Sequence, residues 1–115
     1  MLDFAPAVAV PQPLIVTVHT DGPRTLVRAS GEIDLLSVGE LEAPLTTALE
    51  AGDEIELDLS RIDFIDSTGL RLLLESRNHA HRPGAGPLTL RLGDGVHVRR
   101  LLDLTGVLHL FDLVG

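Results

Sequence analysis

The chain has 115 residues, a formal net charge of −8 at pH 7 and a hydrophobic fraction of 44%. This length fits one domain, and the apolar content is too high for an intrinsically disordered chain. The chain has no lysine and no cysteine, and acidic residues outnumber arginines 17 to 9, so a basic nucleic-acid or membrane-binding stripe, disulfides and thiolate metal sites are excluded.

The N-terminal segment 1–12 contains Pro6 and Pro11, and it carries Asp3 where a signal peptide would carry a basic residue. We expect this segment to be a flexible tail that precedes one folded domain over residues 13–115. No apolar run approaches the roughly 20 residues that a membrane-spanning helix needs. We therefore expect a cytoplasmic protein with no membrane partner.

Apolar periodicity and turn residues predict eight elements in the order β-β-α-β-α-β-α-β. Their expected ranges are strands at 14–18 and 25–31, a helix at 37–52, a strand at 54–65, a helix at 67–81, a strand at 88–92, a helix at 94–106 and a strand at 107–111. Helices that alternate with strands are typical of an α/β layer with parallel pairing.

Local signals refine three of these elements. Ser37 with Glu40 three residues later matches a capping box, and Pro44 predicts a kink within the same helix. Asp94 is a candidate N-cap for the third helix. In the strand at 54–65, acidic and aliphatic residues alternate, which predicts a strand covered on one face with its acidic face in solvent.

The most informative segment joins this strand to the second helix through Asp66-Ser67-Thr68-Gly69. The N-terminus of a helix favours an anion, so phosphorylation of Ser67 would place a dianion there without disturbing the core. The simpler interpretation of Ser67 is an N-cap that accepts a backbone N–H. Thr68 is a weaker candidate for modification.

The element order and two motifs resemble the STAS domain, in particular the bacterial anti-sigma factor antagonists. The first motif is Gly31-Glu32-Ile33-Asp34, and the second is Asp58-Leu59-Ser60 followed by residues 64–70. Residues 98–106 are also similar to the third helix of that family. The resemblance covers roughly residues 14–112 and implies an α/β fold, with a mixed sheet of about five strands and helices mainly on one face.

The resemblance implies a regulatory protein that switches partners and has no catalytic activity or cofactor. In the family, the unmodified antagonist binds an anti-sigma factor serine kinase and displaces the sigma factor. Phosphorylation of the serine equivalent to Ser67 prevents this, and a metal-dependent serine/threonine phosphatase reverses it. We expect Asp34, Asp66, Thr68, Gly69, Leu70 and Arg71 to form the partner-binding surface, and the protein to be a monomer or a weak dimer.

Several alternatives compete with this hypothesis. Some small STAS proteins are structural subunits of membrane-transporter ATPase complexes and need no phosphoserine. Residues 65–69 come close to the nucleophile elbow of serine hydrolases, with Asp103 and His109 in the matching order, but Ile65 replaces the first glycine. Asp34, Asp63 and Asp66 would suit a Mg²⁺ site, although such residues are more often solvated caps. The histidines have no ligand spacing, so no metal is expected.

Overall fold

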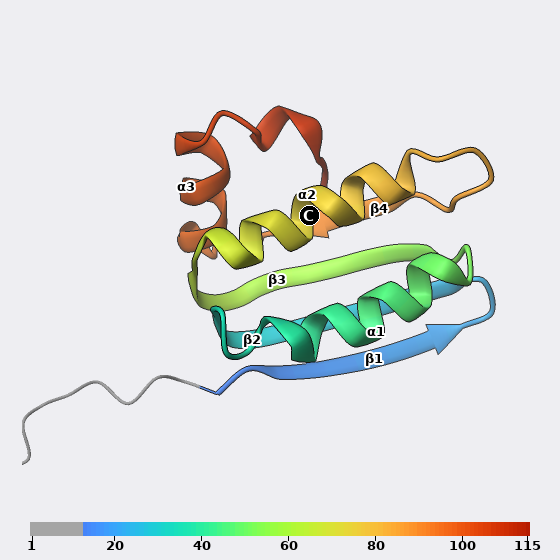
Figure 1. Ribbon diagram of the computed structural model, residues 1–115, viewed down its shortest axis with the longest axis horizontal. Helices are drawn as coiled ribbons and strands as arrows, with labels where there is room; N and C mark the ends of the chain where they lie inside the picture. Colours follow the sequence, from blue (N-terminus) through green and yellow to red (C-terminus); the bar gives the residue numbers. More distant parts are fainter. Residues whose placement is uncertain (1–12) are drawn as a thin grey trace, which may run out of the picture.

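A computed structural model describes residues 13–115 as a five-stranded sheet with three helices (Figure 1). The predicted tail 1–12 lies outside the described residues. The strands are β1 (Ile15–Asp21), β2 (Arg24–Ile33), β3 (Glu54–Ile65), β4 (Leu88–Arg91) and β5 (Asp112–Val114). The helices are α1 (Val38–Glu50), α2 (Ser67–Ala80), α3 (Val96–Leu104) and the single 3-10 turn η1 (Leu108–Leu110).

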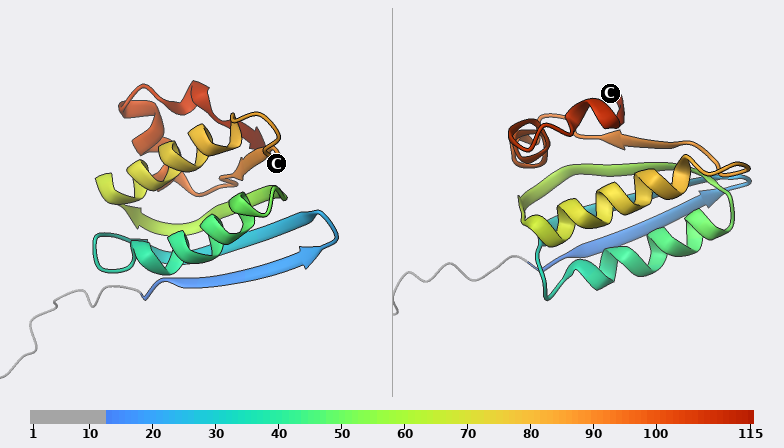
Figure 2. Two further views of the ribbon diagram at one scale, coloured as in Figure 1. Left: turned by 45° about the vertical axis from the view of Figure 1, so that its right-hand side comes forward. Right: turned by 45° about the horizontal axis from the view of Figure 1, so that its top comes forward.

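The strands lie in the order in which they occur along the chain, β1-β2-β3-β4-β5. The tight turn at Gly22 makes β1 and β2 antiparallel, and every later neighbouring pair is parallel. Parallel neighbours need crossover connections, and these are right-handed with few exceptions. Because each crossover steps in the same direction along the sheet, α1 and α2 lie on the same face, as the views in Figure 2 show. The predicted mixed sheet is confirmed.

The core forms between this face of the sheet and the helices. The odd-numbered residues of β3 from Ile55 to Leu59 are buried, as are Leu41 and Leu45 of α1 and Leu73 of α2. The prediction that this strand is covered by helices on one side is therefore confirmed. The α1 helix is unbroken at Pro44 and runs from Val38 to Glu50.

Several predicted details are wrong. The Ser37–Glu40 capping box does not form, because the Ser37 hydroxyl donates to the Glu32 carbonyl oxygen and accepts from the Asp34 N–H. The third helix is preceded by Gly95 as its N-cap residue rather than by Asp94, and no side chain caps it. The predicted last strand at 107–111 is mostly the η1 turn, and the strand follows it as β5.

Candidate functional site

The candidate site lies where β3 ends and α2 begins. Ile65 is the last residue of β3, Asp66 is the N-cap and Ser67 is the first residue of α2. The parallel neighbour β2 ends in register at Ile33, whose carbonyl oxygen accepts the Asp66 N–H at 3.1 Å. Asp34 and Asp66 therefore follow the ends of adjacent strands, as the sequence predicted.

Asp66, not Ser67, caps α2. Its Oδ1 accepts the N–H groups of Thr68 at 2.9 Å and Gly69 at 3.3 Å, and also the Thr68 hydroxyl. The interpretation of Ser67 as the capping residue is therefore wrong. Serine and aspartate are comparable N-caps, but a cap must stand one residue before the helix, and Asp66 holds that position with an extended backbone. Ser67 is left with no capping role.

The ionised form of Asp66 is stabilised in the folded protein. Burial raises the pKa of Asp66, but the hydrogen bonds from the Thr68 hydroxyl and from the amides of Gly69 and Thr68 outweigh it, and the net pKa is lowered. The Leu35 backbone lowers this pKa further. A carboxylate that stays ionised keeps the start of α2 fixed at neutral pH.

The two hydroxyls at the start of α2 differ in their surroundings. The Ser67 side chain is exposed and makes no hydrogen bond to any described residue. The Thr68 side chain is half-buried, and its hydroxyl donates to Asp66. Ser67 is therefore the hydroxyl that an approaching enzyme reaches without breaking a bond within the protein.

The loop between β2 and α1 forms the other side of the junction. Asp34 Oδ1 accepts the N–H groups of Leu36 and Ser37, both at 3.0 Å, so its carboxylate fixes the loop from inside. The loop holds two leucines in solvent, with Leu35 73% and Leu36 94% exposed. Sequence reasoning missed this apolar pair, although two successive leucines outside any helical or strand period were a visible signal.

Gly69 and Leu70 contribute mainly to packing. Gly69 is buried, and a Cβ added to it would lie 2.6 Å from Cγ1 of Ile65 and 2.8 Å from Cγ2 of Ile33. Real Cβ atoms do not approach carbon this closely, so only glycine lets α2 begin against the ends of β2 and β3. Leu70 is partly buried against the core. Buried Gly69 has no side chain to offer a partner, so the expectation that it contacts one directly is not supported by its placement.

Arg71 lies one turn after Ser67 on α2. Its Nε is 3.3 Å from Oε2 of Glu75, and the two side chains are 80% and 58% exposed. Arg71 is thus on the surface, with an acidic neighbour one helical turn further along. The partner-surface residues predicted from sequence therefore divide into exposed Arg71, half-buried Asp34, Asp66, Thr68 and Leu70, and buried Gly69.

The Asp58-Leu59-Ser60 motif has a structural role. Asp58 Oδ2 accepts from Arg28 Nε at 3.1 Å, and Oδ1 accepts from the Ser60 hydroxyl at 2.6 Å. Burial raises the pKa of Asp58, but the Ser60 and Arg28 contacts lower it by more. The prediction that this carboxylate belongs to a solvated acidic face is wrong, because the side chain is only 7% exposed.

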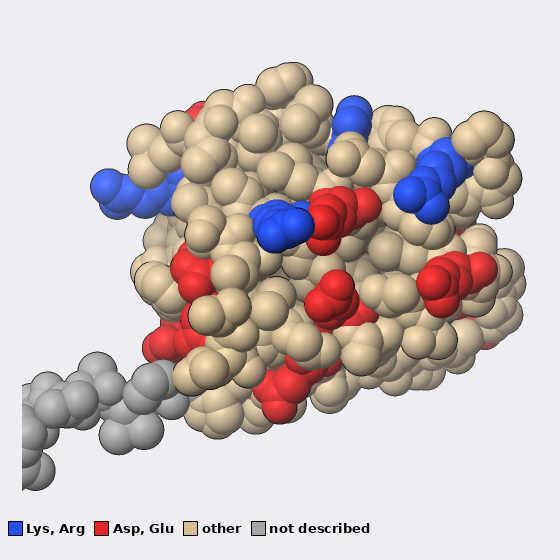
Figure 3. All heavy atoms as spheres, viewed as in Figure 1, with Lys and Arg blue, Asp and Glu red and all other residues tan. Residues whose placement is uncertain are grey.

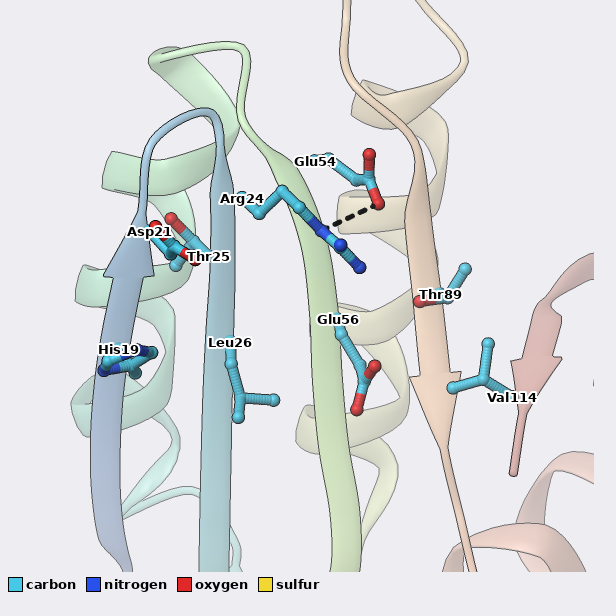
Figure 4. A pocket seen from close by; sticks show the side chains of 9 residues that line it. All are labelled: His19, Asp21, Arg24, Thr25, Leu26, Glu54, Glu56, Thr89 and Val114. Atoms are coloured by element: carbon cyan, nitrogen blue, oxygen red, sulfur yellow. Dashed lines mark ion pairs between the residues drawn. The ribbon is translucent and has the colours of Figure 1, made fainter.

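The uncovered face of the sheet carries further ion pairs. Arg91 Nε lies 2.8 Å from Oε2 of Glu56. Arg24 Nε lies 3.4 Å from Oε2 of Glu54 (Figure 4). The shallow pocket in this view is lined by side chains of all five strands, including His19 and Thr89. Two of its carboxylates pair with arginines on neighbouring strands, Glu54 with Arg24 and Glu56 with Arg91.

The geometry at Ser67 gives no support for the hydrolase alternative. Within residues 13–115, neither His109 nor any other histidine hydrogen-bonds to the Ser67 hydroxyl, so no base activates it. In the same range, no three histidine, aspartate or glutamate side chains gather closely enough to hold a metal ion. No helix among these residues combines the length and apolar character needed to cross a bilayer.

Comparison with known proteins adds independent information. The family described as "Mlab, STAS domain" matches residues 16–114. An anti-sigma-B factor antagonist of Staphylococcus aureus is 31% identical over 82 residues, which are 70% of this chain and 74% of that protein. An anti-sigma factor antagonist from Mycobacterium paratuberculosis superposes with a TM-score of 0.75 at 25% identity, covering 92% of this chain and 89% of that one. The Bacillus protein SpoIIAA in its phosphorylated form shares the fold, with a TM-score of 0.66, 21% identity, and coverage of 88% and 92%.

Proposed function

Because this chain belongs to the STAS domain family, we propose that it is an anti-sigma factor antagonist controlled by phosphorylation of Ser67. In its unmodified form it binds an anti-sigma factor serine kinase, and this binding releases the sigma factor. The kinase inactivates it by transferring a phosphoryl group to Ser67. A metal-dependent serine/threonine phosphatase removes the phosphate and restores binding.

One observation carries this proposal: the hydroxyl of Ser67 is exposed and unbonded at the first position of α2, whereas its neighbour Thr68 is held by Asp66. A kinase active site must enclose the accepting hydroxyl, and only Ser67 meets that need without loss of the helix cap. The modification leaves the Asp66 hydrogen bonds, and therefore the start of α2, in place.

The surroundings of Ser67 explain how one phosphate would prevent binding. The unmodified surface combines exposed Leu35 and Leu36 with the carboxylates of Asp34 and Asp66. A phosphoserine adds about −1.5 to −2 charges at pH 7. Next to existing carboxylates, and on a surface that loses its water when the complex forms, that charge opposes association by several kcal/mol, on the order seen for like charges at interfaces.

Calorimetric titration of a purified anti-sigma factor kinase tests this function. Ser67→Ala is expected to bind as tightly as the wild type, and Ser67→Asp is expected to show no binding. Thr20→Asp, which adds the same charge at an exposed position of β1, is the matched control and is expected to bind normally. Equal affinities of Ser67→Ala and Ser67→Asp would refute the switch. No binding by the wild type or any variant would favour the alternative of a structural subunit in a transporter complex.

A further inference from the structure

A groove separates α1 from α2 and begins beside the candidate phosphorylation site. Both helices follow parallel strands, so they run in the same direction with their N-termini at the Asp34–Asp66 edge (Figure 1). Near this edge the groove is lined by Leu35, Thr68 and Arg71, among others. It continues to the C-terminal ends of the helices, where Thr46, Asn78 and Arg82 line it. The two parts share Glu42, Leu72 and Glu75, so the groove is continuous for about three helical turns, roughly 15 Å.

The α1 side of this groove is acidic. The α1 helix carries Glu40, Glu42 and Glu50 and has no basic residue. Glu42 and Glu50 line the groove, and neither forms an ion pair or a side-chain hydrogen bond with any described residue. On the α2 side, Arg71 is paired with Glu75, and Arg82 lines the C-terminal end of the groove. Figure 3 views this side of the molecule and shows acidic side chains over α1, and an acidic and a basic side chain next to each other over α2.

One buried polar atom of a side chain that lines the groove lacks a partner. Nδ1 of His79 on α2 is buried and has no hydrogen-bond partner among the described residues. Buried polar groups in folded proteins are nearly always hydrogen-bonded, so an exception at the floor of a surface groove points to an external group that completes it.

We propose that this groove binds a basic segment of the anti-sigma factor kinase, so that the contact at Ser67 extends along α1 and α2. This inference rests on the proposed function, because the occupant is the same partner. The partner's arginine or lysine side chains face Glu42 and Glu50, and one of its polar groups reaches Nδ1 of His79. At the N-terminal end the exposed Leu35 and Leu36 supply an apolar anchor that is continuous with the groove.

Charge complementarity of this kind acts mainly on the association rate and its salt dependence. The test therefore measures association of the purified kinase that binds the wild-type chain with the double variant Glu42→Arg/Glu50→Arg. Glutamate and arginine are similar helix formers, and a basic residue at the C-terminus of α1 suits the helix dipole, so the fold is retained. We expect the association rate at low salt to fall about tenfold or more. The deficit is expected to shrink as added salt shortens the Debye length.

The matched control is Asp21→Arg/Asp112→Arg, which changes the net charge equally through exposed residues of β1 and β5. This control is expected to change the rate much less than the groove variant. Glu42→Gln/Glu50→Gln, which removes the charge without reversing it, is expected to show an intermediate loss. Equal losses in the groove and control variants, or no loss in either, would overturn the groove proposal.

Two further outcomes separate this inference from the proposed function. If Ser67→Asp abolishes binding while all groove variants associate like the wild type, the switch stands and the groove has no role. If no anti-sigma factor kinase binds the wild-type chain, both the proposed function and the groove proposal are wrong.

Discussion

Phosphorylation of Ser67 is expected to change the ion pairing of Arg71 and, through it, the stability of the modified protein. In the unmodified chain Arg71 pairs with Glu75 four residues later, at 3.3 Å, with both groups largely in solvent. Ser67 precedes Arg71 by the same four residues, so a phosphate on Ser67 shares a helix face with the guanidinium. The phosphate can accept two hydrogen bonds from that planar group.

The magnitudes decide which partner Arg71 prefers. An exposed pair such as Arg71–Glu75 contributes about 0.2–0.5 kcal/mol, and a basic residue that precedes the acid is the weaker orientation. A phosphate N-terminal to Arg71 has the stronger orientation, carries nearly twice the charge and lies at the positive end of the helix dipole. We expect the phosphorylated protein to gain about 1–2 kcal/mol from the helix end and Arg71 together, of which Arg71 supplies about 0.2–1 kcal/mol.

Thermal unfolding of the modified and unmodified proteins measures this contribution. For a domain of this length, 1 kcal/mol corresponds to about 4 °C in Tm, so Arg71→Ala should reduce the phosphate-induced rise by about 1–4 °C. Arg82→Ala removes an equal charge beyond the C-terminus of α2 and should leave the rise unchanged. If phosphorylation shifts the Tm of the wild type and of Arg71→Ala equally, Arg71 does not hold the phosphate.

Three other outcomes follow from the site geometry. Gly69→Ala should lower the free energy of unfolding by about 1–3 kcal/mol in a denaturant titration, because its Cβ would collide with Ile65 and Ile33. The control Gly39→Ala has no atom within 4 Å of its Cβ and should be neutral or stabilising. Equal effects of the two substitutions would contradict the packing role of Gly69. Because the folded-state pKa of Asp66 is lowered, the contribution of its carboxylate to stability is complete above the unfolded pKa of about 4 and is lost as pH falls through the folded pKa. Asp66→Asn keeps the helix cap but does not titrate, so the variant should lose less stability than the wild type between about pH 5 and 2. An unchanged pH profile of the free energy of unfolding would count against this. The purified chain should hydrolyse a nitrophenyl ester no faster than buffer alone, since no described base contacts Ser67. Ester hydrolysis that is lost in Ser67→Ala would instead make the protein a hydrolase.

The sequence predicted the element order, the mixed sheet and the meeting of Asp34 with Asp66, because these follow from strong periodicity and from the geometry of parallel strands. It failed where two local signals compete. Ser67 and Asp66 are both good N-caps, and only the backbone conformation at the end of β3 decides between them. Residues 107–111 are an apolar run too short to distinguish a strand from a turn.

Other features depend on contacts between distant parts of the chain. Asp58 looked solvated because its neighbours in sequence are acidic or aliphatic, but its partner Arg28 lies 30 residues earlier, on the adjacent strand. The groove between α1 and α2 likewise depends on how two helices pack. The residue types that line it, Glu42 and Glu50 on one helix and Ser76 and His79 on the other, have no sequence spacing in common that could have indicated a shared surface.

The central claim is that Ser67 is the regulatory hydroxyl of this chain. Its most direct test is to incubate the protein with ATP and an anti-sigma factor kinase of proven activity, and to locate the phosphate by mass spectrometry of the resulting peptides. We predict a single phosphate on Ser67 in the wild type and none in Ser67→Ala. A phosphate on Thr68, or an unmodified wild-type chain, would contradict the account.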